Sequence, residues 1–111
     1  MPESAETVIF GPQARIDAAE IYAYTAEEWG ERQAERYLRK LISRLESFAE
    51  TPALWRRLPW RSDNIFFLRV EHHYAIFLSN DDRMLVLGLI GERMDFEQRV
   101  TELLNNENSS N

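Results

Sequence analysis

The residues of this chain that could bind a phosphate or transfer a proton lie in its C-terminal half. They are Arg61, Arg69, His73, Tyr74, Arg83 and Arg93. Arginines can hold a scissile phosphate while histidine or tyrosine moves the proton, which is the chemistry of a metal-free ribonuclease. Arg69 stands out, because strand alternation places it on one face with apolar Ile65 and Phe67. The alternative, which we favour, is that Arg69 reaches the sheet edge or pairs with Glu71 or Asp95, since surface ion pairs are common.

Other catalytic chemistries find no suitable residues in the sequence. His72 and His73 are adjacent, so on a strand they point to opposite faces and cannot chelate a metal from one side. The chain has no cysteine, no H-E-x-x-H metal motif and no G-x-S-x-G nucleophile motif, and its four glycines form no phosphate-binding loop. We therefore expect no metal and no cofactor. The lack of cysteine fits a reducing, cytoplasmic environment.

Length and charge narrow the class of protein further. With 111 residues the chain is expected to form one domain, and it has neither a signal-peptide pattern nor an apolar run near the ~20 residues of a membrane helix. The net charge of −6 argues against sequence-specific nucleic-acid binding. Residues 32–61 nevertheless hold eight bases and three acids, a balance of +5, which leaves −11 on the remainder. Such a segment suits an acidic protein partner, or it is simply a solvated face.

Hydrophobic periodicity predicts the elements that must position these residues. In chain order we expect a strand at 7–10, helices at 13–29 and 32–50, strands at 65–70, 73–79 and 84–91, and a helix at 95–104 that Asp95 caps. The two long helices are joined by few residues, so they should form an antiparallel hairpin. Turns are expected at Glu71-His72 and at Asn80-Asp81-Asp82-Arg83. The tail 105–111, made only of Asn, Glu and Ser, cannot bury apolar surface and is expected to be disordered.

These elements predict an α+β fold with the order β-α-α-β-β-β, in which a helical hairpin packs on a mostly antiparallel sheet and a short helix follows. Residues 1–104 would form the single domain. The segment 53–64, between the hairpin and the next strand, carries Trp55 and Trp60 among three arginines. We expect these tryptophans to pack first against the core, second against a protein partner, and last against nucleic-acid bases.

Short motifs spread along the chain occur in the order and spacing found in one family of bacterial toxins. They are Ala14, Asp17, Ala18 and Ile21; Trp29-Gly30; Gln33-Ala34 with Tyr37; Pro52; Leu68-Arg69; His73-Tyr74-Ala75-Ile76-Phe77; Leu87-Gly88-Leu89-Ile90; and Arg93-Met94-Asp95. Each motif is weak alone, but together they span Ile9 to Phe96. In this the chain resembles the ParE branch of the RelE/ParE toxins of type II toxin–antitoxin pairs.

The resemblance implies a toxin that inhibits DNA gyrase by protein binding and is neutralised by a ParD-like antitoxin in a hetero-oligomer. The RelE branch implies instead a ribosome-dependent mRNA endonuclease. In this chain such an enzyme would use Arg69, Arg83 or Arg93, with His73 or Tyr74 as the proton-transfer group.

The chain departs from the RelE pattern in ways that favour the gyrase-binding interpretation. RelE-like enzymes look rich in lysine and arginine on the sheet face, whereas this chain has one lysine, Lys40, on a helix. Its C-terminal aromatic residue, Phe96, cannot transfer a proton. A separate departure, Gly91-Glu92 where the family often has histidine, concerns the ParE-type activity itself and is the reason an inactive relative stays an alternative. We therefore favour a non-enzymatic, gyrase-binding toxin over a ribonuclease and over an inactive relative.

The resemblance also implies two sets of binding residues. The target would contact the C-terminal determinant Arg93, Met94, Asp95 and Phe96, with Arg61 and Arg69 as secondary candidates. An amphipathic antitoxin helix would lie over the helical hairpin and the sheet edge, because the second helix has a wide apolar stripe and the first is rich in alanine. The antitoxin-binding candidates are Ile21, Tyr22, Trp29, Tyr37, Leu38, Leu41, Leu45, Trp55 and Trp60.

Overall fold

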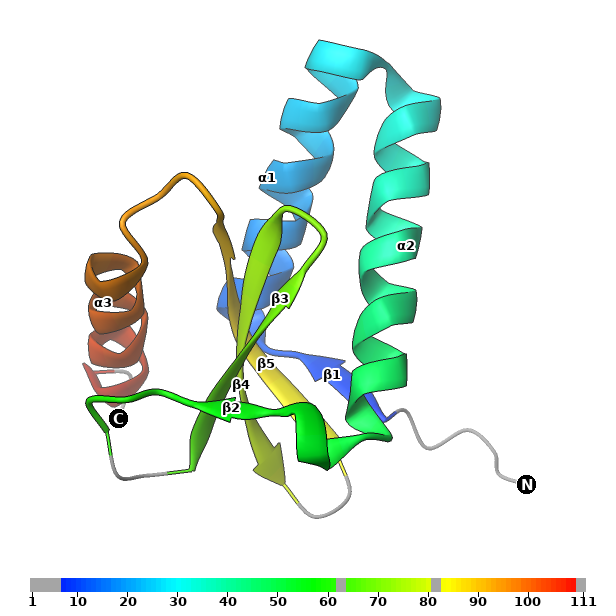
Figure 1. Ribbon diagram of the computed structural model, residues 1–111. Coiled ribbons are helices and arrows are strands. Elements are labelled where there is room, and N and C mark those ends of the chain that lie inside the picture. Colours follow the sequence, from blue (N-terminus) through cyan, green and yellow to red (C-terminus); the bar gives the residue numbers. More distant parts are fainter. Residues whose placement is uncertain (1–6, 62–63, 81–82, 110–111) are drawn as a thin grey trace.

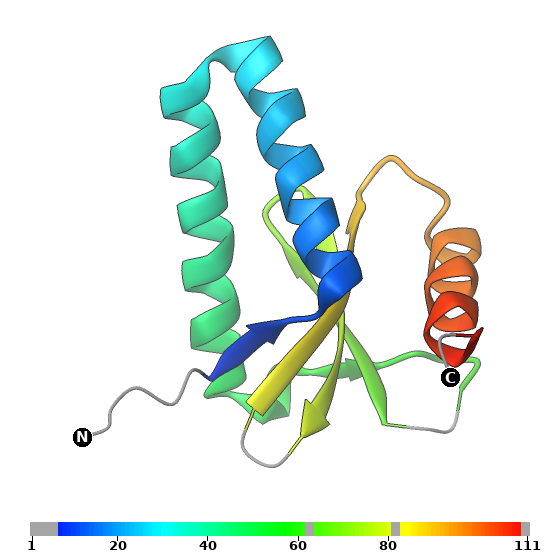
Figure 2. The same ribbon diagram turned by 180° about the vertical axis from the view of Figure 1, so that it is seen from behind.

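The computed structural model describes residues 7–61, 64–80 and 83–109 of the chain. Its elements are β1 (Val8–Phe10), α1 (Pro12–Trp29), α2 (Glu31–Ala49), the 3₁₀ turn η2 (Pro52–Leu54), β2 (Arg56–Arg57), β3 (Ile65–Val70), β4 (His73–Asn80), β5 (Arg83–Gly91) and α3 (Phe96–Ser109). The α1–α2 hairpin covers one face of the sheet, and α3 covers the other (Figure 1, Figure 2). No helix in the described part of the chain is long and apolar enough to cross a membrane.

The strands form one sheet in the order β1-β5-β4-β3-β2. Every neighbouring pair is antiparallel except β1 and β5, which are parallel because the helical hairpin carries the chain back across the sheet. The predicted α+β fold, with a helical hairpin on a mostly antiparallel sheet, is confirmed. β2 was not predicted: a strand of two residues is too short to produce a pattern, and it forms only because β3 pairs with it.

The helix ends follow their local chemistry. Pro12 begins α1, as suits the first helical position, and Gly30 alone separates α1 from α2. Gly30 has a φ of 97°, which strongly favours glycine, and its N–H donates to the carbonyl oxygen of Ala26. At α3 the predicted cap is confirmed, because the Asp95 carboxylate accepts a hydrogen bond of 3.1 Å from the Gln98 N–H.

α3 differs from its predicted length. It continues to Ser109, whereas the sequence pattern ended it at Leu104 and assigned 105–111 to a disordered tail. A helix that buried side chains have nucleated gains one hydrogen bond for each further residue, so it can extend past its last apolar contact. Residues 110–111 lie outside the described residues, as do residues 1–6 and Asp81-Asp82 of the predicted turn.

The sheet separates two apolar cores. The first lies between the sheet and the hairpin, and its buried members include Ala14, Leu41, Leu45, Phe77 and Val86. The second lies between the sheet and α3, and its buried members include Leu58, Ile76, Val100, Leu103 and Leu104. The predicted alternation of β3 is confirmed, with Phe66, Leu68 and Val70 in the first core and Ile65 and Phe67 in the second.

β5 needs a partner beyond the end of β1. β1 pairs only with Met84, Leu85 and Val86, so the next edge amides of β5 have no strand beside them. The Asp17 carboxylate of α1 fills this role, since its Oδ2 accepts a hydrogen bond of 2.9 Å from the Leu89 N–H. Gly88 lies at the same point, where a Cβ would come within 2.7 Å of the Leu103 side chain. The hairpin and α3 thus both meet β5 here.

Replacing Asp17 by alanine should destabilise the fold by about 1–3 kcal/mol, because it leaves the Leu89 N–H without its acceptor inside the protein. Urea unfolding of the wild type and the variant would measure the loss. Glu20→Ala, an exposed change on the same helix, is the matched control and should stay within about 0.5 kcal/mol of the wild type. Equal losses for the two variants would contradict this role of Asp17.

Candidate functional site

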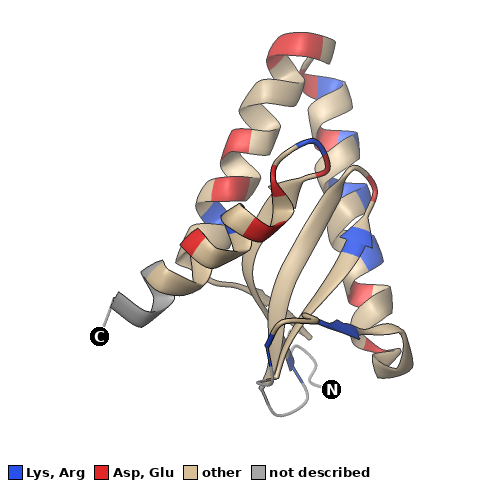
Figure 3. Cartoon of the chain, turned by 60° about the vertical axis from the view of Figure 1, so that its left-hand side comes forward, with Lys and Arg blue, Asp and Glu red and all other residues tan. Residues whose placement is uncertain are grey.

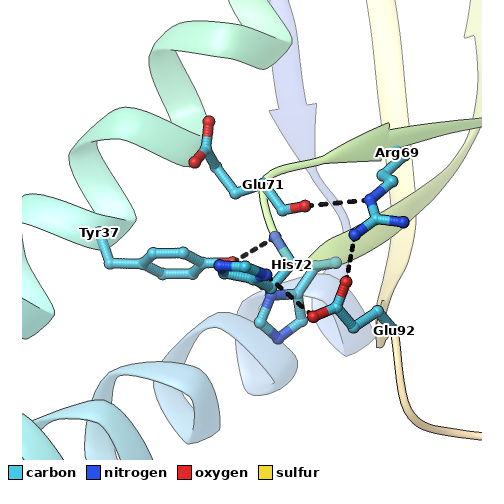
Figure 4. A network of polar contacts seen from close by, with 6 residues as sticks. Tyr37, Arg69, Glu71, His72 and Glu92 are labelled. Carbon is cyan, nitrogen blue, oxygen red and sulfur yellow. Dashed lines mark hydrogen bonds and ion pairs between the residues drawn. The ribbon is translucent and has the colours of Figure 1, made fainter.

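Three separate segments meet in a polar network at the β3–β4 turn, which we call the turn network: Tyr37, Arg69, Glu71, His72 and Glu92 (Figure 4). Arg69 pairs with the carboxylate of Glu92, and its Nε donates a hydrogen bond of 3.3 Å to the carbonyl oxygen of Glu71. His72 Nδ1 lies 2.9 Å from the other oxygen of Glu92. The Glu92 N–H donates to the carbonyl oxygen of His72 at 3.0 Å. The start of the loop after β5 is therefore tied to the turn by both backbone and side chain.

Glu71 gives this turn an unusual backbone. Its φ is 56°, in the region that glycine normally occupies, and it is the only described residue other than glycine with a positive φ. Its carboxylate lies 3.5 Å from Lys40 Nζ and 3.5 Å from Arg44 Nε, both on α2. These contacts, and the hydrogen bond of 3.0 Å that the His72 N–H donates to the Tyr37 hydroxyl, hold the turn against α2. A residue other than glycine keeps such a backbone conformation where several contacts with its surroundings hold it in place.

Tyr37 and His73 form the inner end of the same cluster. The Tyr37 hydroxyl oxygen lies 2.7 Å from His73 Nδ1. Burial raises the pKa of Tyr37, so the phenol stays protonated. Burial also lowers the pKa of His73, helped by nearby His72, while Glu92 and Asp17 oppose the shift less strongly. The pair is therefore a neutral hydrogen bond that joins α2 to the start of β4.

A second surface lies on the α3 side of the sheet. Four aromatic rings pack there, and we call them the aromatic face: Trp60, Phe67, Tyr74 and Phe96. Phe96 is central, with ring centroids 5.0 Å from Tyr74 and 5.3 Å from Phe67. The Arg69 guanidinium lies 5.9 Å from the Tyr74 ring and connects this face to the turn network.

The structure places the six predicted target-binding residues around these two features. Arg69 belongs to the turn network and Phe96 to the aromatic face. Arg93 and Met94 are exposed in the loop between β5 and α3, and Asp95 ends that loop as the α3 cap. Arg61 is half-buried, next to Trp60 in the chain. Arg69 is exposed beside the part of the sheet edge that β2 leaves uncovered, as the favoured alternative expected, and it contacts Glu71 through that residue's carbonyl oxygen. Its carboxylate partner is Glu92 and not Asp95, because the Glu71 carboxylate binds α2 and Asp95 caps α3.

The residues of the ribonuclease alternative are not gathered in one site. Tyr74 and Arg69 face the α3 side, but His73 points to the hairpin side, where it contacts Tyr37. Arg83 pairs with Asn80 across the hairpin turn at the opposite end of β4 from His73. The described residues therefore give His73 and Arg83 no shared access to a phosphate on the α3 side. They also contain no group of three or more His, Cys, Asp or Glu that could hold a metal ion.

The antitoxin candidates divide by burial. Leu41 and Leu45 have no exposed surface because they fill the first core, so their prediction as contact residues is wrong for this conformation. Trp55 also packs inward, with its indole N–H donating to the carbonyl oxygen of Phe48 at 2.7 Å. Half-buried candidates are Ile21, Tyr22, Tyr37 and Leu38, and exposed ones are Trp29 and Trp60.

Sequence reasoning missed a second apolar stripe on α1. Ile16 is 52% exposed and Tyr24 is 64% exposed, on the side of α1 that does not face the core. Exposed alanines at positions 19 and 23 lie between them. The predicted candidate Trp29 is 72% exposed at the end of α1, on another side of the helix. The eight-residue spacing of Ile16 and Tyr24 was an indication of this stripe in the sequence. Because alanines lie on every side of α1, however, the periodicity did not show which side of the helix the core covers.

Charge is divided between the two helices of the hairpin. In Figure 3 the coloured positions of α1 are mostly acidic, whereas those of α2 are mostly basic with some acidic positions among them. On α2 the exposed bases are Arg32, Arg36, Arg39, Lys40 and Arg44. An apolar stripe on α1 beside a basic α2 is the surface that an amphipathic helix with acidic residues fits.

Comparison with known proteins adds three findings. A family model described as the ParE toxin of the type II toxin-antitoxin system parDE matches residues 8–96. The toxin ParE of Escherichia coli is 30% identical over 97 residues, which cover 86% of this chain and 94% of that protein. A solved structure titled as the chromosomal ParDE TA system from P. aeruginosa has the same fold, with a TM-score of 0.64 and 14% identity over 77% of this chain and 94% of the matched chain. The match to the family model includes the whole turn network.

The buried His73 predicts a pH dependence of stability. Its pKa in the folded chain is lowered below the ordinary value of about 6.5, so as pH falls through 6.5 the unfolded chain takes up the proton first. Stability should therefore fall between pH 7 and pH 5.5, by at most about 1.4 kcal/mol per pH unit from this residue. His73→Asn should lose that part of the slope. Urea unfolding at several pH values would measure it, and parallel curves for the two proteins would contradict the assignment.

Proposed function

Because this chain belongs to the ParE toxin family of type II toxin–antitoxin systems, we propose that it acts by binding DNA gyrase and is silenced by a ParD-like antitoxin. The observation that supports the proposal is that two separate parts of the surface each have a composition suited to a protein partner. The β5–α3 loop and aromatic face form one region, and the outer face of the hairpin forms the other. One protein surface can then serve the target while the other serves the antitoxin.

The β5–α3 loop suits a target protein because it is held in place before binding. Glu92 is anchored to Arg69 and His72, and Asp95 is anchored as the cap of α3. Arg93 and Met94 lie between the two anchors with their side chains exposed. A loop with fixed ends loses less conformational entropy on binding, and arginine beside aromatic rings is a common composition of interface hot spots. This supports protein binding by Arg93, Met94 and the nearby Phe96.

The hairpin surface suits an amphipathic antitoxin helix. Ile16 and Tyr24 offer apolar contacts, and the bases of α2 offer pairing to acidic residues beside them. The similar structure from P. aeruginosa carries ParD with ParE in its title, which supports a ParD-like partner for this chain as well. Large exposed apolar side chains that lie close together on a small protein often mark a surface that a partner covers.

Purified chain should trap cleaved DNA on gyrase and inhibit supercoiling, and added antitoxin should suppress both effects. Arg93→Ala should lower the potency about tenfold or more, the range of an arginine hot spot. The matched control is Arg83→Ala, an exposed arginine at the other end of the sheet, which should keep the potency of the wild type. Wild-type chain without effect on gyrase would reject the proposed target, and ribosome-dependent mRNA cleavage would then be the next assay.

The double variant Ile16→Ala/Tyr24→Ala should weaken antitoxin binding about tenfold or more while its effect on gyrase stays intact, because it truncates only the outer face of α1. Calorimetric titration of antitoxin into each protein would measure the change. Thr101→Ala, an exposed change on α3, is the control and should bind as the wild type does. Unchanged affinity of the double variant would remove the α1 stripe from the proposed antitoxin site.

A further inference from the structure

The edge of β3 is only partly covered. In the two-residue hairpin Val70 pairs with His73, so strand alternation turns the backbone N–H and C=O of Arg69 away from β4, toward the free edge. β2 covers that edge at Phe66 and Phe67, and the Leu58 N–H continues the pairing to the carbonyl oxygen of Ile65, but the pairing does not extend toward Arg69. Among the described residues no strand therefore lies beside Arg69. An exposed stretch of edge backbone is a template for an added strand.

A groove of about 450 Å³ runs along this uncovered edge. Its walls come from α2, η2, β2, β3 and β4, and its lining residues are Phe48, Leu54, Arg56, Phe67, Leu68, Arg69 and Tyr74. Leu54 is 53% exposed although it is a large apolar residue. The groove thus combines unpaired backbone with apolar side chains that a partner could cover.

The pairing register of β2 and β3 places different kinds of side chain on the two sides of this groove. Arg56 lies directly opposite Phe67, so it shares with Arg69 the face toward α3. Leu68 lies on the other face, where Phe48 packs against the first core. One side of the groove therefore carries the two arginines beside the rings of Phe67 and Tyr74, and the other side is apolar. An extended segment places alternate side chains on opposite faces, so acidic and apolar residues in alternation would match both sides at once.

The acids nearby do not cancel this positive charge completely. The Glu71 carboxylate is shared by Lys40 and Arg44, and the Glu92 carboxylate by Arg69 and His72. Arg56 is exposed, with no carboxylate paired to it in the described contacts. In a chain of net charge −6, this edge is thus a local concentration of bases. Charge complementarity of this kind selects an acidic partner.

We propose that the free edge of β3 binds an extended acidic segment of the neutralising partner as an added strand. The segment pairs with the backbone of Arg69, places carboxylates beside Arg56 and Arg69, and covers Leu54 and Phe48 with an apolar side chain. The inference rests on the proposed neutralisation by an antitoxin and adds a contact on the sheet edge, separate from the apolar stripe of α1. It also places a partner segment against Arg69, next to the loop that presents Arg93.

The test uses the full chain with the protein encoded by the neighbouring antitoxin reading frame. Amide hydrogen exchange at Arg69 should slow on binding, because strand addition gives that N–H a partner. Arg56→Glu should weaken binding about tenfold or more by reversing the charge beside the added strand. Arg57→Glu is the matched control: Arg57 faces the other side, over the Phe66 ring at 5.0 Å, and should change affinity less than about twofold.

A second variant keeps the test decisive if Arg56→Glu does not fold. Leu54→Ala removes only an exposed side chain and should weaken binding several-fold. If the antitoxin binds the wild type but leaves Arg69 exchange unchanged, and binds Arg56→Glu and Leu54→Ala normally, the strand is rejected while neutralisation stands. If the antitoxin does not bind the wild type, both proposals are rejected.

Discussion

Burial of β5 on all sides is the constraint on which the rest of this structure depends. From Met84 to Ile90 the strand is buried apart from half-buried Leu85, because the hairpin covers one face and α3 the other. A strand in this position has to find partners for its edge amides inside the protein. β1 supplies them up to Val86, and the Asp17 carboxylate supplies one at Leu89. The small Gly88 lets α3 approach at the same level. Both helical layers are thus positioned by one strand.

The turn network connects the buried strand β5 to the surface of the protein. Glu92 follows directly after β5. Its contacts with Arg69 and His72 hold the start of the loop that leads to α3 in a defined position. On its inner side, Tyr37 and the Lys40–Glu71–Arg44 contacts tie the β3–β4 turn to α2. Hairpin, sheet and loop therefore meet at one end of the molecule. The Gly91-Glu92 pair, a departure from the expected family pattern, here supplies the anchor of the loop.

The distribution of charge gives each surface a different partner chemistry. The acids of α1 and the bases of α2 lie on neighbouring helices of the hairpin (Figure 3). Arg56 and Arg69 flank the free sheet edge. Such local fields have more influence on association than the net charge does, since screening limits each exposed charge to about 10 Å at moderate salt. An acidic protein can therefore present a basic surface where its partner binds.

The sequence by itself determined the order of the elements, the two faces of β3, the Asp95 cap and the family. The elements and the cap follow from periodicity and capping chemistry, which depend on residues close together in the chain. The family follows from the order and spacing of short motifs over Ile9 to Phe96. Only the tertiary structure decided that β1 joins β5 in parallel, that a two-residue β2 forms, and that Glu92 rather than Asp95 pairs with Arg69. It also decided that Leu41 and Leu45 are core while Ile16 and Tyr24 are surface. The physical reason is that periodicity identifies which residues are apolar, whereas burial depends on which distant element arrives to cover them.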